Sequence, residues 1–224
     1  MRRTFEDARR WARLGTELFL GAAESGFDEP SALPGWTRAH LVAHVAANAD
    51  ALGNLVHWAA TGERTPMYAS PEERAQGIER GRTLPGAELA AWLCDSAAEL
   101  EKGMAGLGDE QWRALVVTAQ GRTVPATEVP WMRAREVCVH AVDLAGPVTF
   151  ADLPADFLTA LCDDVVDKRS AAPGPAVFLR APSATWELPG EGEPALVAGE
   201  LHDLAAYLTG RDTGTSAPVL GAWL

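Results

Sequence analysis

Apolar side chains recur at every third or fourth position through the first two-thirds of the chain, a spacing typical of helices that bury one face. Segments rich in Pro and Gly divide this region into four stretches: residues 5–26, 37–62, 71–106 and 127–146. Four long helices joined by long connections predict an antiparallel bundle.

Capping residues mark where these helices should begin. The four predicted N-caps are Thr4, Thr37, Ser70 and Thr127. Ser70 is the strongest of them, because a proline and two glutamates follow it and both residue types suit the first turn of a helix. The third stretch should be interrupted near residues 82–86, and a short extended segment is expected at residues 115–118.

The pattern changes after residue 146. Residues 154–168 keep a helical spacing, but three short apolar or alternating segments follow them: 176–179, 184–188 and 195–198. Turns rich in Pro and Gly separate these segments, and a last short helix is expected at residues 201–208. We therefore predict an α+β protein with a four-helix bundle in residues 1–148 and a small α-β-β-β-α domain in residues 149–224.

The charge balance narrows the choice of partners. The chain has 19 basic and 31 acidic side chains, a net charge of −12. Nucleic acids and anionic membranes bind basic surfaces, so neither is expected as a partner. An anionic substrate would need individual arginines to hold it.

Several features predict a cytoplasmic protein. No apolar run approaches the ~20 residues that a membrane span needs, and no apolar region follows the basic N-terminus as in a secretory signal. Cys94, Cys138 and Cys162 form no CxxC pair and no disulfide framework. Each is expected to be a buried thiol in a reducing compartment.

The predicted fourth helix carries polar side chains inside an apolar run. Residues 137–144 are apolar nearly all round, which indicates a buried helix, yet Glu136, His140 and Asp143 interrupt the pattern. Glu136 and His140 lie one turn apart on the same face. Burying a carboxylate and an imidazole is costly unless both are compensated, and a shared cation would compensate them. A plain hydrogen-bonded Glu136–His140 pair, or an ion pair of Glu136 with Arg133, is the alternative.

A second helix offers a third ligand. His44 lies at the edge of the apolar stripe in residues 37–62, where it can turn into the bundle. His44, Glu136 and His140 would form a set of two histidines and one carboxylate that leaves a coordination position open, as catalytic zinc sites do. Such a set also suits iron. A core histidine bonded to a backbone carbonyl is the alternative for His44.

Four segments carry a resemblance to a known family: residues 33–46, 57–68, 118–127 and 131–144. The first contains the sequence GWT, and the last contains ExxxH. Through these segments the chain resembles the DinB-like superfamily of mycothiol-dependent enzymes. The longer runs, at residues 57–82 and 118–144, resemble its maleylpyruvate isomerase family in particular. The likeness extends over essentially the whole chain.

This resemblance implies an activity and a site. It implies that His44, Glu136 and His140 hold Zn²⁺, that mycothiol is the cofactor, and that Arg74 and Arg211 bind the dicarboxylate substrate. The implied reaction converts maleylpyruvate to fumarylpyruvate by addition of a thiolate, rotation about the former double bond and expulsion of the thiol. The protein's own cysteines would not act as nucleophiles.

Further expectations follow from this interpretation. Asn48, Gln120 and Asp143 are candidates for polar groups around the metal or in the substrate pocket. Because Arg211 lies in the C-terminal domain, the active site is expected between the two domains of a monomer. The alternatives are a mycothiol S-transferase acting on another electrophile and a metal-stabilised binding protein without turnover.

Overall fold

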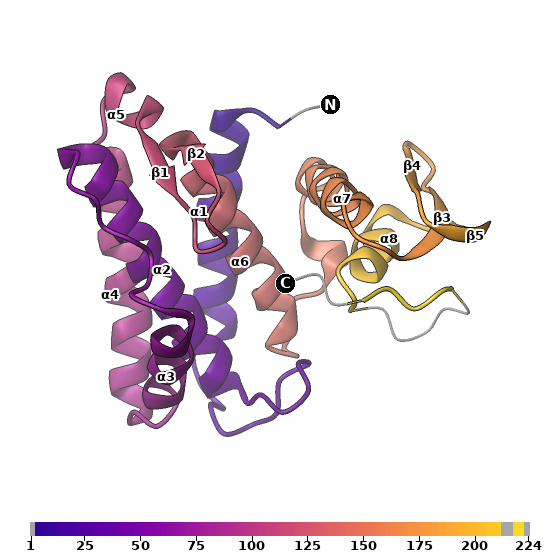
Figure 1. The fold of residues 1–224 in the computed structure, drawn as a ribbon. Helices are drawn as coiled ribbons and strands as arrows, with labels where there is room; N and C mark the ends of the chain where they lie inside the picture. The colour runs from indigo at the N-terminus through magenta and orange to yellow at the C-terminus, as the bar shows by residue number, and fades with distance from the viewer. Residues whose placement is uncertain (1–2, 212–216, 222–224) are drawn as a thin grey trace. The chain divides into compact units, whose positions relative to one another are not determined.

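The structure is a computed structural model that describes residues 3–211 and 217–221 (Figure 1). The chain divides into two compact units, one spanning Thr4–Val148 and the other beginning at Thr149. Within the described residues, no helix is both long enough and apolar enough to cross a membrane.

Four long helices form the N-terminal unit: α1 (Phe5–Ala22), α2 (Arg38–Thr61), α4 (Gly86–Ala105) and α6 (Val129–Asp143). Helix α1 packs against α6, α6 against α2, and α2 against α4. These contacts confirm the predicted α+β class with a helical bundle at its N-terminal end.

The helix directions follow from their contacts. Trp11 meets Trp131, and four residues further along α1 Gly15 lies against Cys138, so α1 and α6 run in the same direction. The predicted antiparallel arrangement is therefore wrong for this pair of neighbouring helices. A Cβ at Gly15 would lie 2.5 Å from the Cys138 sulfur, so only glycine allows this close approach. Helices α2 and α6 run in opposite directions, because the His44 end of α2 lies beside the C-terminal half of α6.

The third predicted stretch is two helices. Helix α3 (Pro71–Gly81) begins at the Ser70 cap, whose hydroxyl accepts from Glu73 N, and packs against α2. The predicted interruption at residues 82–86 separates it from α4.

The predicted cap at Thr127 is wrong. Residues Ala126–Glu128 form a 3-10 turn, and α6 begins only at Val129 without a side-chain cap. Pro130 lies in the first turn of α6, where a missing N–H costs no helical hydrogen bond. The proline therefore marks the helix start better than the threonine does.

A short hairpin follows α5 (Asp109–Arg113). Strand β1 (Leu115–Val117) is the predicted extended segment, and it pairs antiparallel with β2 (Thr123–Pro125). Val116 and Val124 bury their side chains in one cluster with residues of α2, so the hairpin covers part of that helix.

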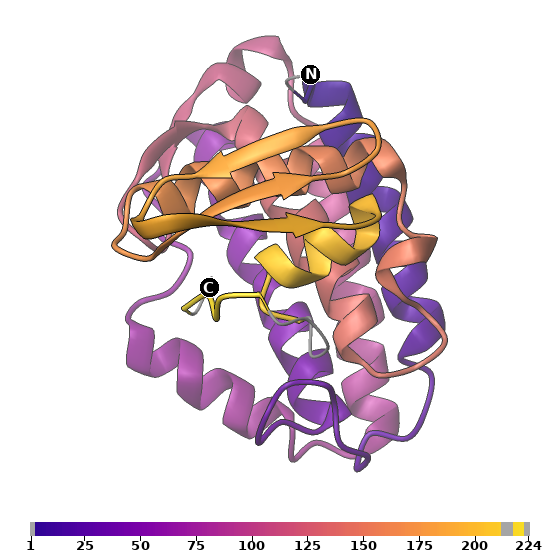
Figure 2. The same cartoon turned by 90° about the vertical axis from the view of Figure 1, so that its right-hand side faces the viewer.

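The C-terminal unit contains α7 (Ala155–Ser170), β3 (Pro175–Arg180), β4 (Thr185–Leu188), β5 (Glu191–Ala198) and α8 (Leu201–Leu208). This is the predicted α-β-β-β-α order. Strand β3 lies in the centre of the sheet, antiparallel to β4 and parallel to β5. Both helices lie on one face of the sheet (Figure 2).

Alternation along the strands explains this packing. Val177 and Leu179 of β3 are fully buried, whereas Phe178 between them is exposed. Trp186 of β4 donates from its indole N–H to Asp163 of α7 at 2.7 Å, which ties the sheet to that helix.

Candidate metal centre

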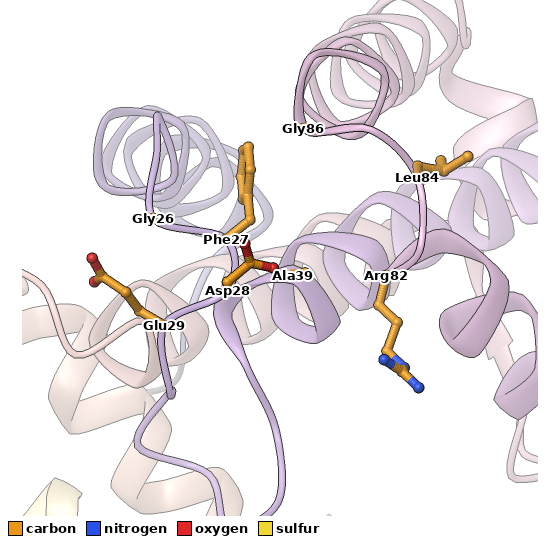
Figure 3. Close-up of a pocket in the computed structure, with 8 residues that line it drawn as sticks. All are labelled: Gly26, Phe27, Asp28, Glu29, Ala39, Arg82, Leu84 and Gly86. Carbon is orange, nitrogen blue, oxygen red and sulfur yellow. The ribbon is translucent and has the colours of Figure 1, made fainter.

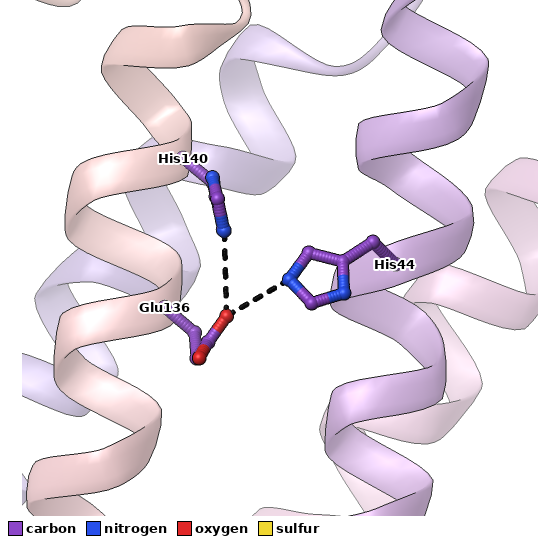
Figure 4. A group of neighbouring side chains, drawn as sticks. All are labelled: His44, Glu136 and His140. Carbon is purple, nitrogen blue, oxygen red and sulfur yellow. Dashed lines mark hydrogen bonds and ion pairs between the residues drawn. The ribbon is translucent and has the colours of Figure 1, made fainter. Parts of the chain in front are cut away.

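Two facing helices bring three metal-ligating side chains together (Figure 4). His44 extends from α2, and Glu136 and His140 extend from α6. The Oε2 atom of Glu136 lies 3.0 Å from Nε2 of His44 and 3.4 Å from Nε2 of His140. The ligand atoms of all three residues lie within 4.8 Å of one another. The structure thus assembles the three residues singled out in the sequence.

The spacing of these atoms suits a small divalent ion. Zinc bonds to nitrogen and oxygen are about 2.0–2.2 Å long, which sets neighbouring ligands about 3.4 Å apart in a tetrahedron. The two shorter separations here, 3.0 and 3.4 Å, are close to that value. Both histidines are buried, and the Glu136 side chain is 18% exposed. The set therefore fits zinc in donor type and in spacing.

The three groups differ in charge. Burial would raise the pKa of Glu136, but the adjoining imidazoles of His140 and His44 hold it well below its usual range. Burial lowers the pKa of His44 despite its contact with Glu136. Burial also disfavours a charged His140, yet hydrogen bonds to Asp143 and Glu136 outweigh it and raise the pKa of His140 to about 9. The site thus combines an ionised carboxylate with two histidines in different environments.

Asp143 orients His140. Its carboxylate is fully buried and lies 2.7 Å from Nδ1 of His140, so it accepts the proton on that nitrogen and leaves Nε2 facing Glu136. The sequence singled out Asp143 as a polar group of the site, and the structure places it directly behind the ring.

Replacing Asp143 with asparagine should weaken metal binding by about 10- to 100-fold, because outer partners of this kind fix the tautomer and the basicity of a ligating histidine. Titration of the metal-free protein with zinc against a competing chelator measures the effect. Asp156→Asn, at the start of α7, serves as a control. Unchanged affinity in Asp143→Asn would show that the carboxylate has no part in setting the ligand.

Arg133 ties the two ligand-bearing helices together. It lies one turn before Glu136 on α6, and its Nη1 donates to Val45 O at 2.8 Å and to Asn48 Oδ1 at 3.1 Å, both on α2. Burial lowers the pKa of Arg133 to about 10, so the guanidinium stays charged at neutral pH. Asn48 was predicted as a polar group around the metal or in the substrate pocket, and in the structure it accepts a hydrogen bond from this arginine.

Arg74 of α3 contacts His44 on the side of the ring that faces away from Glu136. Its Nη2 donates to Nδ1 of His44 at 3.4 Å, and its guanidinium carbon lies 5.8 Å from the Tyr68 ring centroid. Burial raises the pKa of Tyr68, so its phenol stays protonated. The structure thus brings one of the two predicted arginines to the ligand set.

Aromatic packing holds the start of α2. The Trp36 ring meets His44 edge-on and stacks on His40, with 5.8 Å between the ring centroids in each case. His40 accepts from Thr37 N through Nδ1, so it closes the helix start. Trp36 was not predicted as part of the site, although its position directly before the Thr37 cap was a usable signal.

Two further candidates were predicted, Gln120 and Arg211. Gln120 is exposed in the turn of the β1–β2 hairpin. Arg211 follows α8 in the C-terminal unit, where its Nη1 donates to Thr209 O at 2.6 Å. Arg211 as a substrate-binding residue stays a prediction.

The prediction of three buried cysteines is correct for two. Cys138 and Cys162 are buried, and burial raises the pKa of each thiol to about 12. Cys94 is exposed, because α4 buries the stripe that contains Leu89 and Leu93 and turns residue 94 outward.

One cavity of the N-terminal unit has a volume of about 580 Å³, and none of the three candidate metal ligands lines it. It is lined by the turn before α2 and by the segment between α3 and α4. Figure 3 shows Glu29 and Arg82 pointing away from each other at its two sides. Its charged groups do not converge on a shared point, so the metal centre is the stronger candidate for chemistry.

Comparisons with known proteins agree with this geometry. A family model described as mycothiol maleylpyruvate isomerase N-terminal domain matches residues 7–145. Two crystal structures, of the mycothiol-dependent maleylpyruvate isomerase and of a histidine-to-alanine mutant of it, each match at 40% sequence identity and a TM-score of 0.88. Each match covers 94% of this chain and 90% of the other. A search of curated proteins found no match.

Proposed function

This chain belongs to the family of mycothiol-dependent maleylpyruvate isomerases, and from this membership we propose that it is a zinc- and mycothiol-dependent cis–trans isomerase. Its substrate is maleylpyruvate and its product is fumarylpyruvate. It acts as a cytoplasmic monomer. The observation that carries the proposal is the His44, Glu136 and His140 cluster in a chain that matches the isomerase along 94% of its length.

The three clustered residues would hold zinc and leave one position open. When bound, zinc and mycothiol would supply a thiolate, whose addition to the conjugated double bond makes that bond single and free to rotate before the thiol leaves. Histidines bind a metal as neutral imidazoles, so in the loaded site Glu136 would supply the negative charge of the three protein ligands. Asp143 holds the Nδ1 proton of His140, and Arg133 keeps α6 at its distance from α2.

Arg74 would bind a carboxylate of the substrate. A guanidinium presents several N–H donors in one plane, which matches the two oxygens of a carboxylate. Its contact with His44 places it beside the ligand set. On a chain with a net charge of −12, such a local positive group is what a dianionic substrate requires.

We propose Arg211 as a second carboxylate-binding group. Arg211→Ala should keep its zinc and its fold but lose about 10-fold or more in kcat/KM, because a charged hydrogen bond contributes about 1.5–3 kcal/mol. Arg211→Lys should recover only part of the loss. Zinc content and steady-state kinetics on the same samples measure this. Parental activity in Arg211→Ala would remove the arginine from the substrate site.

The cysteines should be dispensable. Single replacement of Cys94, Cys138 or Cys162 by Ser or Ala should leave turnover within a few-fold of the parent, apart from packing losses at the two buried positions. The buried thiols are held in their unreactive protonated form. A variant that folds and binds zinc but does not turn over would contradict a nucleophile supplied by mycothiol.

An ultraviolet assay of maleylpyruvate isomerisation, with and without mycothiol, tests the proposal. Turnover that depends on mycothiol supports it. Conjugation of a test electrophile without isomerisation would favour the alternative of a mycothiol S-transferase. A cobalt-substituted protein whose spectrum does not respond to any thiol would favour a binding protein without turnover.

A further inference from the structure

A second cavity lies directly beside the metal centre. It has a volume of about 390 Å³, within the range of small-molecule sites. Helices α2 and α3 and the segment before α3 line it, and all of its residues belong to the N-terminal unit. Arg74 and Tyr68 form part of its wall, and the same Arg74 guanidinium contacts His44. The Arg74 side chain therefore connects the cavity wall with His44, a proposed zinc ligand.

Polar groups with spare hydrogen-bonding capacity line this cavity. Trp92 donates to Oδ2 of Asp50, and no described residue donates to Oδ1. The Asn54 amide nitrogen donates to the carbonyls of Pro66 and Met67, which leaves its oxygen available. Within the described chain, the Arg80 guanidinium forms no hydrogen bond or ion pair. The cavity wall therefore offers both hydrogen-bond acceptors and hydrogen-bond donors to a ligand.

The charges around the cavity argue against the dicarboxylate as its occupant. Asp50 and Glu73 oppose Arg74 and Arg80, so the lining is neutral overall. A dianion would meet two carboxylates there, whereas an uncharged ligand rich in hydroxyl groups can donate to the carboxylates and accept from the guanidinium groups. Met67, Ala51 and the Tyr68 ring add an apolar wall of the kind that a sugar ring can cover.

We propose that this cavity binds the glucosaminyl-inositol part of mycothiol, a neutral and hydroxyl-rich pseudodisaccharide, and that the attached cysteine arm reaches past Arg74 and Tyr68 toward the ligand set. The proposal rests on the proposed function and names the subsite of its cofactor. Arg74 then lies between the two ligands: the sugars occupy the cavity that it lines, and the dicarboxylate binds on the side of Arg74 that faces His44.

Gly77 gives a direct test. It lines the cavity from the middle of α3, and a Cβ built there meets no atom within 4 Å. Gly77→Leu should therefore keep the fold while its side chain fills the space. Gly21→Leu is the matched control, because Gly21 is also helical and open but lies on α1 away from the cavity. Melting temperature and zinc content establish that both variants are intact.

The binding probe is the N-acetylated pseudodisaccharide without the cysteine, measured by calorimetry on the zinc-loaded protein. It should bind the parent and Gly21→Leu equally, and bind Gly77→Leu about tenfold more weakly or worse. Asp50→Asn should weaken it as well. Equal binding to Gly77→Leu and the parent, or no binding to the parent, would overturn the proposal. This readout needs no turnover, so it stands apart from a failure of the isomerase assay.

Kinetics separate the two ligands. In Gly77→Leu the KM for mycothiol should rise about tenfold or more, whereas the KM for maleylpyruvate should stay near that of the parent. With N-acetylcysteine as a thiol that lacks the sugars, Gly77→Leu and the parent should turn over at similar rates. A raised KM for maleylpyruvate with an unchanged KM for mycothiol would assign the cavity to the substrate and overturn the proposal.

Discussion

Alanine at His44, Glu136 or His140 is expected to remove most of the bound metal, which in the parent should be about one zinc per chain. Each side chain would supply one of three ligands, and the two that remain would bind the ion too weakly to keep it through purification. Turnover should fall by more than about 100-fold, the upper end of the loss expected when an outer partner alone is removed. Metal analysis and the isomerase assay on the same preparations measure both effects.

His57→Ala is the matched control for these variants. His57 lies on the same helix as His44, but its side chain is 53% exposed and far along α2. It should keep metal and activity. Stoichiometric zinc in all three ligand variants would exclude this cluster as the metal site.

Arg74→Ala should lower kcat/KM for maleylpyruvate by about 10- to 150-fold, which corresponds to one charged hydrogen bond of about 1.5–3 kcal/mol. The zinc content should change little, because Arg74 contacts His44 only through the nitrogen that faces away from Glu136. Arg74→Lys should recover only part of the efficiency, since an ammonium cannot bind a carboxylate through two parallel donors.

The exposed Arg113, on α5 near the other end of α2, provides a charge-matched control for Arg74. Arg113→Ala removes the same charge from the chain at a distance from the ligand set. An equal loss of efficiency in Arg113→Ala and Arg74→Ala would point to the net charge of the protein rather than to a contact with the substrate.

Much of the ligand set was predictable because it interrupts a regular pattern. Glu136, His140 and Asp143 stand in an otherwise apolar helix, and helical periodicity alone places the first two on one face. His44 followed from the edge of the stripe on α2. The bounds of α2 and the order of the C-terminal elements were also readable, because Thr37, Gly62 and the Pro- and Gly-rich turns mark them.

The features that the sequence did not predict depend on contacts between distant segments. Arg133 was readable only as a local partner of Glu136, whereas its hydrogen bonds go to α2, 88 and 85 residues away in sequence. Strand β2 is three residues long, too short for a periodicity of its own, and exists through its pairing with β1. The cavity beside Arg74 arises from how α3 lies on α2, which no single helix encodes.

The Arg133 hydrogen bonds have a consequence for how the metal enters and leaves. They fix the gap between α2 and α6 with protein atoms, on a residue that is only 2% exposed. The two helices should therefore keep their arrangement without the ion. A zinc-finger domain differs, because removal of its zinc unfolds the chain. A chelator should accordingly yield an empty but folded protein that takes up zinc, cobalt or iron again from solution, so the metal found in the cell would follow supply as well as affinity.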